Sequence, residues 1–307
     1  MSKMDDYSSS KLRALTDAEL AEALKNVLGN ANLPRRRVPL PPVLSPKQKM
    51  SEKLREIQSY ISSLEYNHTG VSYVRMRKDR GAHHVLVTAK ELIREALPIQ
   101  CVEAVFIGLY LLDGEDILSF PLSFKSRVAG QVYRHIVLVV VHAGKYGALG
   151  ISRCPQLMDK KLKFKSMADI IREYETCYEA VDHELLRVYI GLPFSPDAQP
   201  TGMIQWKAIR LSMSKPWTDI EEAANRFAKQ GPKLTKYHNR TGELPDECKP
   251  WSSDGAEDGA DEEVGSGAAD DEGDNKSDAS DDGGISREAP IGSTPTSPIS
   301  RNRVFGV

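Results

Sequence analysis

Cys101 is the residue of this sequence whose surroundings best suit a nucleophile. It lies in a stretch, residues 98–112, that begins with Pro98 and then places apolar side chains at helical spacing. Proline is tolerated in the first turn of a helix, which predicts that Cys101 lies in the first turn of a buried helix. The unpaired N–H groups and the positive end of the helix dipole favour a thiolate there. The alternative is that Cys101 is a small buried hydrophobic residue, as most free cysteines are.

A nucleophilic cysteine needs a base, and His135 is the strongest candidate among the seven histidines. It interrupts the very apolar segment 133–141, which is predicted to be a strand. A buried histidine in a strand is usually a satisfied core residue, yet a helix-borne cysteine facing a strand-borne histidine is also the arrangement of papain-like and transglutaminase-like enzymes. Ser152 ends the next predicted strand, and its hydroxyl could accept an imidazole N–H and orient the ring. Spacing alone favours the view that Ser152 does not have this role.

The elements that must position these residues form an α+β pattern. Helices come first, and a mostly antiparallel sheet with helices beside it follows. A capping box at residues 16–19 also predicts a short helix up to Gly29. Further helices are predicted over residues 45–64, 88–96, 98–112, 165–186 and 218–229, and strands over 71–76, 118–128, 131–141, 146–151, 186–190 and 204–211.

Three regions of the chain differ in composition. Residues 1–46 are predicted to be a flexible N-terminal region with one short helix and a linker rich in proline and arginine. Residues 47–240 form the predicted globular domain. Residues 250–307 are predicted to be disordered, because they are too poor in apolar side chains to offset the chain entropy lost on folding.

Charge is divided unevenly between these regions. Residues 254–307 hold 14 acidic and four basic side chains, which leaves 29 acidic and 37 basic side chains for residues 1–253. The body is therefore about +8 and the tail about −10. A basic body suits an acidic partner, such as a nucleic acid, an anionic membrane or an acidic peptide. The tail itself could occupy such a surface within the same chain.

The cysteines and the apolar segments exclude several classes of protein. The cysteines lack metal-ligand spacing, which argues against a zinc site and a disulfide framework and indicates a reducing compartment. Residues 1–14 lack the apolar core of a signal peptide, and the longest apolar run, 136–141, is too short to span a membrane. We therefore expect a cytoplasmic protein without a metal. The four cysteines are Cys101, Cys154, Cys177 and Cys248.

Several long segments, in order along the chain, resemble the vasohibins, a family of tubulin tyrosine carboxypeptidases. The resemblance covers roughly residues 50–235 and leaves out the acidic tail. It implies a transglutaminase-like or papain-like cysteine protease fold, in which the cysteine helix packs on the sheet that carries the histidine. The matching segments are YNHTG at 66–70, EALPIQCVEAV at 95–105, FPLSFK at 120–125, YRHIVL at 133–138 and AGKYGALGISR at 143–153.

The resemblance implies a Cys-His-Ser triad at Cys101, His135 and Ser152, and no metal or organic cofactor. It also implies that Tyr66 and Arg153 bind the free C-terminal carboxylate of the substrate. The family normally has a lysine just before the catalytic cysteine, where this sequence has Gln100. Gln100 can donate a hydrogen bond but brings no charge, and losing one charge-assisted bond would cost about 1–2 kcal/mol of binding.

The implied substrate is the acidic tail of α-tubulin, which ends in tyrosine. Lys125 together with Arg77, Lys78 and Arg80 lies where the family has basic residues around its substrate groove. Vertebrate vasohibins also bind a small helical chaperone, the small vasohibin-binding protein. The predicted contact residues for such a partner are Met50, Leu54, Ile57 and Ile61, although the same apolar stripe also suits the core of the protein itself.

These observations predict a cytoplasmic, microtubule-associated cysteine carboxypeptidase that removes the C-terminal tyrosine of α-tubulin, with no nucleic-acid or membrane partner. One alternative is a transglutaminase-type acyl transfer through the same Cys101 thioester. Another is a microtubule-binding protein, or a regulatory protein secreted by an unconventional route, whose triad is vestigial.

Overall fold

The computed structural model describes residues 38–78, 80–194, 204–244 and 248. The first part of the predicted linker, up to residue 37, and the whole of the acidic tail, residues 250–307, lie outside the described residues. Around the first predicted helix, six further residues are described: Thr16, which is not helical, and the helical residues Ala18, Ala21, Glu22, Lys25 and Asn26.

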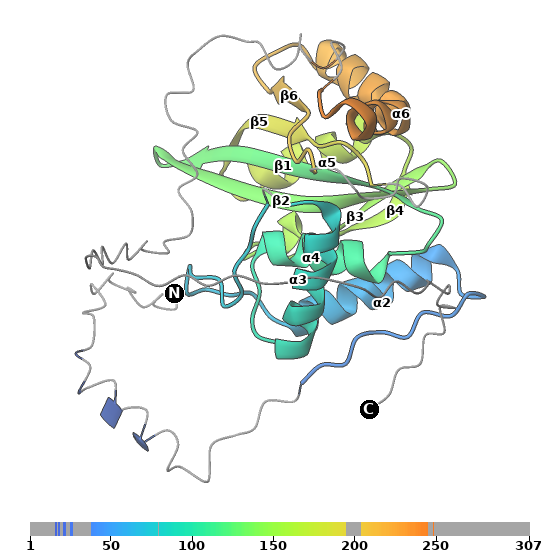
Figure 1. The fold of residues 1–307 in the computed structure, drawn as a ribbon. Helices are drawn as coiled ribbons and strands as arrows, with labels where there is room; N and C mark the ends of the chain where they lie inside the picture. The colour runs from blue at the N-terminus through green and yellow to red at the C-terminus, as the bar shows by residue number, and fades with distance from the viewer. Residues whose placement is uncertain are drawn as a thin grey trace, which may run out of the picture. The chain divides into compact units, whose positions relative to one another are not determined.

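A six-stranded antiparallel sheet is the centre of the described fold, in the order β4-β3-β2-β1-β5-β6 (Figure 1). Helices α2 to α4 cover one face of this sheet, and α5 and α6 cover the other. The α+β prediction is confirmed, with the cysteine helix α4 packed on the strand β2 that carries the histidine. The strands are β1 (Leu118–Val128), β2 (Gln131–His142), β3 (Lys145–Leu149), β4 (Lys160–Phe164), β5 (Glu184–Ile190) and β6 (Ile209–Ser212); the helices are α2 (Met50–Ser63), α3 (Ala82–Glu95), α4 (Cys101–Leu111), the 3₁₀ turn η1 (Pro155–Leu157), α5 (Met167–Glu179) and α6 (Trp217–Thr241).

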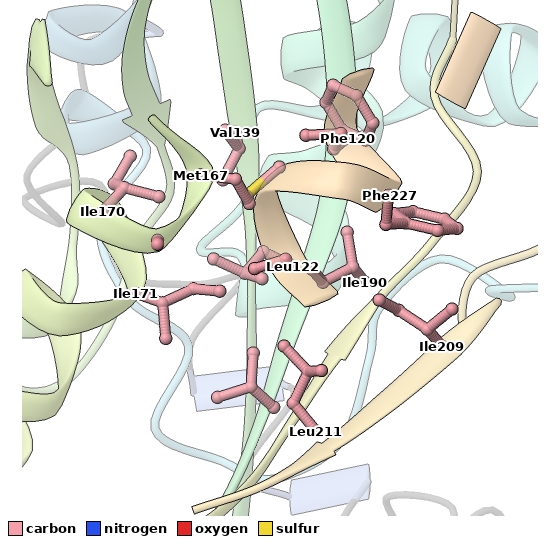
Figure 2. Close-up of a cluster of buried hydrophobic side chains, with 14 of the residues drawn as sticks. Phe120, Leu122, Val139, Met167, Ile170, Ile171, Ile190, Ile209, Leu211 and Phe227 are labelled. Atoms are coloured by element: carbon pink, nitrogen blue, oxygen red, sulfur yellow. The ribbon is translucent and has the colours of Figure 1, made fainter. Parts of the chain in front are cut away.

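Strand β2 alternates between two hydrophobic cores because successive side chains of a strand point to opposite faces. Val137 and Val139 join the core that α5 and α6 cover, and Ile136, Leu138 and Val140 join the core that α2 to α4 cover. Figure 2 shows the first core, where side chains of the sheet meet those of α5 and α6. The labelled members are Phe120, Leu122, Val139, Met167, Ile170, Ile171, Ile190, Ile209, Leu211 and Phe227.

The β1–β2 hairpin is predicted correctly, including its turn. Ala129 and Gly130 both have positive φ, 47° and 79°. Two-residue turns of this kind match the twist of the paired strands, and glycine adopts positive φ without strain.

Several predicted elements differ from the structure. The helix predicted over 218–229 continues to Thr241, and the strand predicted over 204–211 covers only Ile209–Ser212. Residues 71–76 form no strand, and Val71 and Tyr73 are about half exposed. Helix α3 begins six residues earlier than predicted, at Ala82, and the helix predicted over 165–186 ends at Glu179, so that β5 can begin at Glu184. Strand β4 was not predicted, because its lysines mask the alternation of a strand at the edge of the sheet.

The apolar stripe of α2 belongs to the core of the protein. Leu54 is 7 % exposed, and Ile57 and Ile61 are fully buried. Met50 packs against the same cluster. Leu54, Ile57 and Ile61 thus serve the core of the protein itself, while Met50 is only partly buried, and a helical partner at this helix stays a prediction.

Candidate active site

Helix α4 places the Cys101 thiol beside the backbone of β2. Cys101 is the first residue of α4, and Pro98 precedes the N-cap, Gln100, instead of lying in the first turn as predicted. The thiol accepts a hydrogen bond from the backbone N–H of Ile136. Because β3 pairs with β2 only from Leu138 onward, this contact lies on the part of β2 that β3 leaves uncovered. Cys101 thus meets β2 one residue after His135.

Burial is the largest influence on the pKa of Cys101, which is partly buried in the structure. It raises the pKa of the thiol above its ordinary value. The N–H groups of Ile136, Val102 and Cys101 itself and the charge of Lys78 lower the pKa, but they do not offset the burial. The helix N-terminus therefore acts in the predicted direction, and the resting group is nevertheless a neutral thiol.

The imidazole of His135 packs on the face of the sheet that α5 and α6 cover, opposite to the face that carries α4. Its ring stacks on Phe124, with ring centroids 6.1 Å apart and planes 18° apart. Its Nε2 lies 2.8 Å from the carbonyl oxygen of Leu157. A carbonyl oxygen can only accept, so Nε2 carries the hydrogen, and the neutral ring has its lone pair on Nδ1. Nδ1 is therefore the atom that can take a proton.

The His135 ring is neutral at ordinary pH. Burial lowers its pKa to about 4, and the charge of Lys160 also lowers it, while the hydrogen bond to Leu157 acts in the opposite direction. A neutral thiol bonded to the backbone N–H of the residue after His135, and the neutral imidazole of His135, are the two kinds of group that a nucleophile and its base require.

The orienting group of His135 differs from the one predicted. The Ser152 hydroxyl accepts a hydrogen bond from the backbone N–H of Cys154, at 3.2 Å, and within residues 80–194 it makes no hydrogen bond to His135. The Leu157 carbonyl fills that position. No residue type in the sequence could reveal this acceptor, because every residue has a backbone carbonyl.

Tyr66 and Arg153 come together next to the nucleophile. Tyr66 forms a parallel bridge with Ile99, two residues before Cys101. The Arg153 guanidinium lies 5.9 Å from the centre of the Tyr66 ring and makes a hydrogen bond to its side chain. Burial raises the pKa of the Tyr66 hydroxyl, Cys101 adds to this rise, and Arg153 opposes it. Arg153 is exposed, so its charge can reach a substrate.

Gln100 is part of the cap of α4. Its backbone N–H donates to the Glu103 carboxylate, and its side chain accepts from the Glu103 N–H, which together form a capping box. Burial raises the pKa of Glu103, and the hydrogen bonds from Gln100 and Ser72 oppose the rise. The predicted role of Gln100 in binding a carboxylate would therefore compete with its role in the cap.

The predicted basic residues lie in two parts of the fold, the 71–80 segment and strand β1. Lys78 belongs to the 71–80 segment, where its carbonyl accepts from the indole N–H of Trp206 at 3.1 Å. Trp206 in turn stacks on Phe106 of α4, with ring centroids 5.5 Å apart. Arg77 and Arg80 belong to the same segment.

Lys125 lies at the centre of a row of basic residues across the sheet. It pairs with Arg134 of β2 on one side and with Arg187 of β5 on the other. Cross-strand neighbours of like charge destabilise a sheet, so such a row suits a surface that meets acidic groups. Arg134 and Arg187 were not singled out from the sequence, because strand register cannot be read from it.

The described residues contain no group of three or more histidine, cysteine or acidic side chains placed to hold a metal ion. Within the same residues, no helix is both long and apolar enough to cross a membrane.

Comparison with known proteins relates the chain to one family. The model of the vasohibin family matches residues 7–231. A mouse protein named tubulinyl-Tyr carboxypeptidase 1 is 39 % identical over 190 residues, which are 62 % of this chain and 51 % of the mouse protein. The chain thus spans about half the length of this relative.

Proposed function

The chain belongs to the vasohibin family, and from the geometry of its site we propose that it is a cysteine carboxypeptidase that removes the C-terminal tyrosine of α-tubulin. The observation that carries this proposal is a thiol that meets strand β2 one residue after an oriented neutral imidazole, with the Tyr66–Arg153 pair close to the thiol. We also propose that the protein acts on microtubules in the cytoplasm.

In the proposed reaction, Cys101 attacks the carbonyl carbon of the last peptide bond. The C–S bond forms as the thiol proton moves to Nδ1 of His135, and the carbonyl oxygen becomes an oxyanion. Backbone N–H groups at the start of α4 are the candidate donors to that oxyanion. The C–N bond then breaks, and the imidazolium gives its proton to the leaving tyrosine amine. Water attacks the remaining thioester with His135 as base, which regenerates the thiol.

Arg153 and Tyr66 make the enzyme a carboxypeptidase instead of an endopeptidase. A charged guanidinium and a hydroxyl beside the nucleophile provide charge-assisted hydrogen bonds for a free C-terminal carboxylate. A peptide that continues beyond the scissile bond would place an uncharged amide there and lose those bonds. This pair therefore selects the last residue of the chain.

The basic residues provide for the rest of the substrate. Lys125, Arg134 and Arg187 form a row on the sheet, and Lys78 lies close enough to Cys101 to lower the pKa of its thiol. An acidic peptide with its C-terminus at Arg153 would be attracted both by the row around Lys125 and by Lys78. We propose that these residues, with Arg77 and Arg80, bind the tubulin tail.

The test is tyrosine release from purified microtubules by the intact protein, by Cys101→Ala and by Cys177→Ala. Cys177 is another partly buried free cysteine and serves as the matched control. Each reaction is run with and without the small vasohibin-binding protein. We expect release by the intact protein and by Cys177→Ala, and none by Cys101→Ala. Products of higher mass that contain crosslinked tubulin would indicate acyl transfer, and microtubule binding without release under both conditions would indicate a binding protein; either result would overturn the proposal.

A further inference from the structure

The segment that orients His135 is held at every one of five consecutive carbonyl groups. The carbonyls of Cys154 and Pro155 accept from the N–H groups of Leu157 and Met158, at 2.9 and 3.2 Å, and so close the η1 turn. The Gln156 carbonyl accepts from the Lys160 ammonium. The Leu157 carbonyl accepts from His135. The fifth carbonyl, that of Met158, accepts from the Tyr174 hydroxyl at 2.6 Å.

Tyr174 connects α5 to this turn through the hydrogen bond from its hydroxyl to the Met158 carbonyl. It is fully buried, and it continues the apolar face of α5 whose earlier members, Met167, Ile170 and Ile171, are packed in the core of Figure 2. Its ring lies 4.8 Å from the Phe124 ring, on which His135 stacks. Burial raises the pKa of its hydroxyl well above the ordinary value, so the group remains a donor over the pH range of folded proteins.

Lys160 contacts both the Gln156 carbonyl and the ring of Tyr174, the residue that binds the Met158 carbonyl. Its ammonium lies 4.6 Å from the centre of the Tyr174 ring while it donates to the Gln156 carbonyl. The carbonyls on either side of Leu157 are therefore fixed by two side chains that also touch each other. A peptide plane with both neighbouring planes fixed has little freedom to rotate.

We propose that Tyr174, assisted by Lys160, is a positioning residue that fixes the Leu157 carbonyl and thereby keeps the hydrogen of His135 on Nε2 and the lone pair on Nδ1. This inference rests on the proposed function, because it explains how the base of that reaction is kept ready. The group that orients His135 is a backbone carbonyl. Its position therefore depends on the side chains that bind the neighbouring carbonyls, which are Tyr174 of α5 and Lys160 of β4.

Tyr178 provides a matched control for Tyr174. Both tyrosines are buried on α5 and both pack on Phe124, with Tyr178 at 5.5 Å between ring centroids. The Tyr178 hydroxyl, however, has no hydrogen-bond partner among the described residues. Changing either tyrosine to phenylalanine keeps the packing of the ring, and only the change at Tyr174 removes a bond to the turn.

The experiment measures the tautomer and the rate separately. Nitrogen NMR of protein labelled at histidine reports which ring nitrogen of His135 carries the hydrogen, without any substrate. We expect the Nε2–H form in the intact protein and in Tyr178→Phe, and a mixture of tautomers in Tyr174→Phe. With a tubulin-tail peptide, Tyr174→Phe should lower kcat about 5- to 10-fold and leave KM unchanged, as expected for the loss of one buried hydrogen bond.

Lys160→Met provides a second measurement that does not open the core, since Lys160 is only partly buried. It should shift the tautomer in the same direction, and Lys160→Arg should restore it. An unchanged His135 spectrum in both Tyr174→Phe and Lys160→Met would overturn the inference. The NMR result stands even if no tyrosine is released by any variant, so failure of the positioning role and failure of the proposed function can be told apart.

Discussion

The two groups that we propose to react, Cys101 and His135, are held from opposite faces of one sheet, and they are held in different ways. Cys101 is positioned by α4, whose first turn and capping box are made by residues next to it in the chain. His135 is positioned by a carbonyl 22 residues further along, which α5 and β4 hold in turn. The nucleophile thus depends on local structure, and the base depends on long-range packing.

Burial acts on both groups and shifts their pKa values in opposite directions. It raises the pKa of the Cys101 thiol and lowers that of His135, and in each case it favours the neutral form. At rest the site therefore holds a neutral thiol and a neutral imidazole, and not a preformed thiolate–imidazolium ion pair. Variants that change one face of the sheet and leave the other intact test whether the two groups are held independently.

The largest expected effect is on stability in acid. A histidine that has a pKa of about 4 when folded, against about 6.5 when unfolded, leaves stability unchanged above pH 6.5. As the pH falls from about 6.5 to about 4, His135 becomes protonated in the unfolded chain but stays neutral in the folded chain. The free energy of unfolding should therefore fall by up to about 3 kcal/mol.

His135→Gln is the variant that isolates this contribution. Chemical denaturation at several pH values should show that the intact protein loses more stability than the variant between pH 6.5 and pH 4. Parallel curves would mean that His135 is not held neutral. The same pKa predicts that kcat/KM of the intact enzyme for a tail peptide rises with a midpoint near pH 4 and levels off above about pH 5.

The comparison also explains what the sequence could reveal. The stripe after Cys101 and the hairpin around Ala129-Gly130 are encoded in local periodicity and turn chemistry, so α4, β1 and β2 are predicted well. The motifs around Tyr66 and Arg153 carry side chains whose chemistry can be recognised, and the structure brings these two together.

The other face could not be predicted in the same way. The acceptor for His135 is a backbone atom of Leu157, and Tyr174 is indistinguishable in the sequence from the other apolar members of α5. The residues 71–76 fail as a strand for a related reason. A strand needs a neighbour to accept its hydrogen bonds, and periodicity does not say whether one exists.

On the nucleophile side, Arg153→Met should lower kcat/KM for a tubulin-tail peptide about 30-fold, because hydrogen bonds to charged groups contribute about 2 kcal/mol. The loss should be much smaller for the same peptide with an amidated C-terminus, which lacks the carboxylate. Arg94→Met, an exposed arginine paired with Glu95, is the matched control. Equal losses with both peptides would exclude Arg153 from carboxylate recognition.

Ser152→Ala distinguishes the observed orienting group from the predicted one. Since Ser152 accepts from Cys154 and not from His135, the variant loses a bond within the turn. We expect kcat to fall about 5-fold, the effect of one ordinary hydrogen bond, with the His135 tautomer unchanged by NMR. A loss of activity as complete as that of Cys101→Ala would show that Ser152 takes a direct part in the reaction.

The smallest expected effect comes from Gln100→Lys, which adds a charge beside the nucleophile and removes a cap. The new ammonium can pair with the substrate carboxylate, and it should lower KM for the tail peptide about 5-fold while leaving kcat nearly unchanged. The loss of the Gln100 part of the capping box should cost about 1 kcal/mol of stability, measurable as a lower denaturation midpoint. Gln100→Met loses the cap without gaining the charge and separates the two effects. If KM does not fall in Gln100→Lys, the Tyr66–Arg153 pair and Lys78 already satisfy the carboxylate, and the glutamine at this position is then explained by the stability of α4 alone.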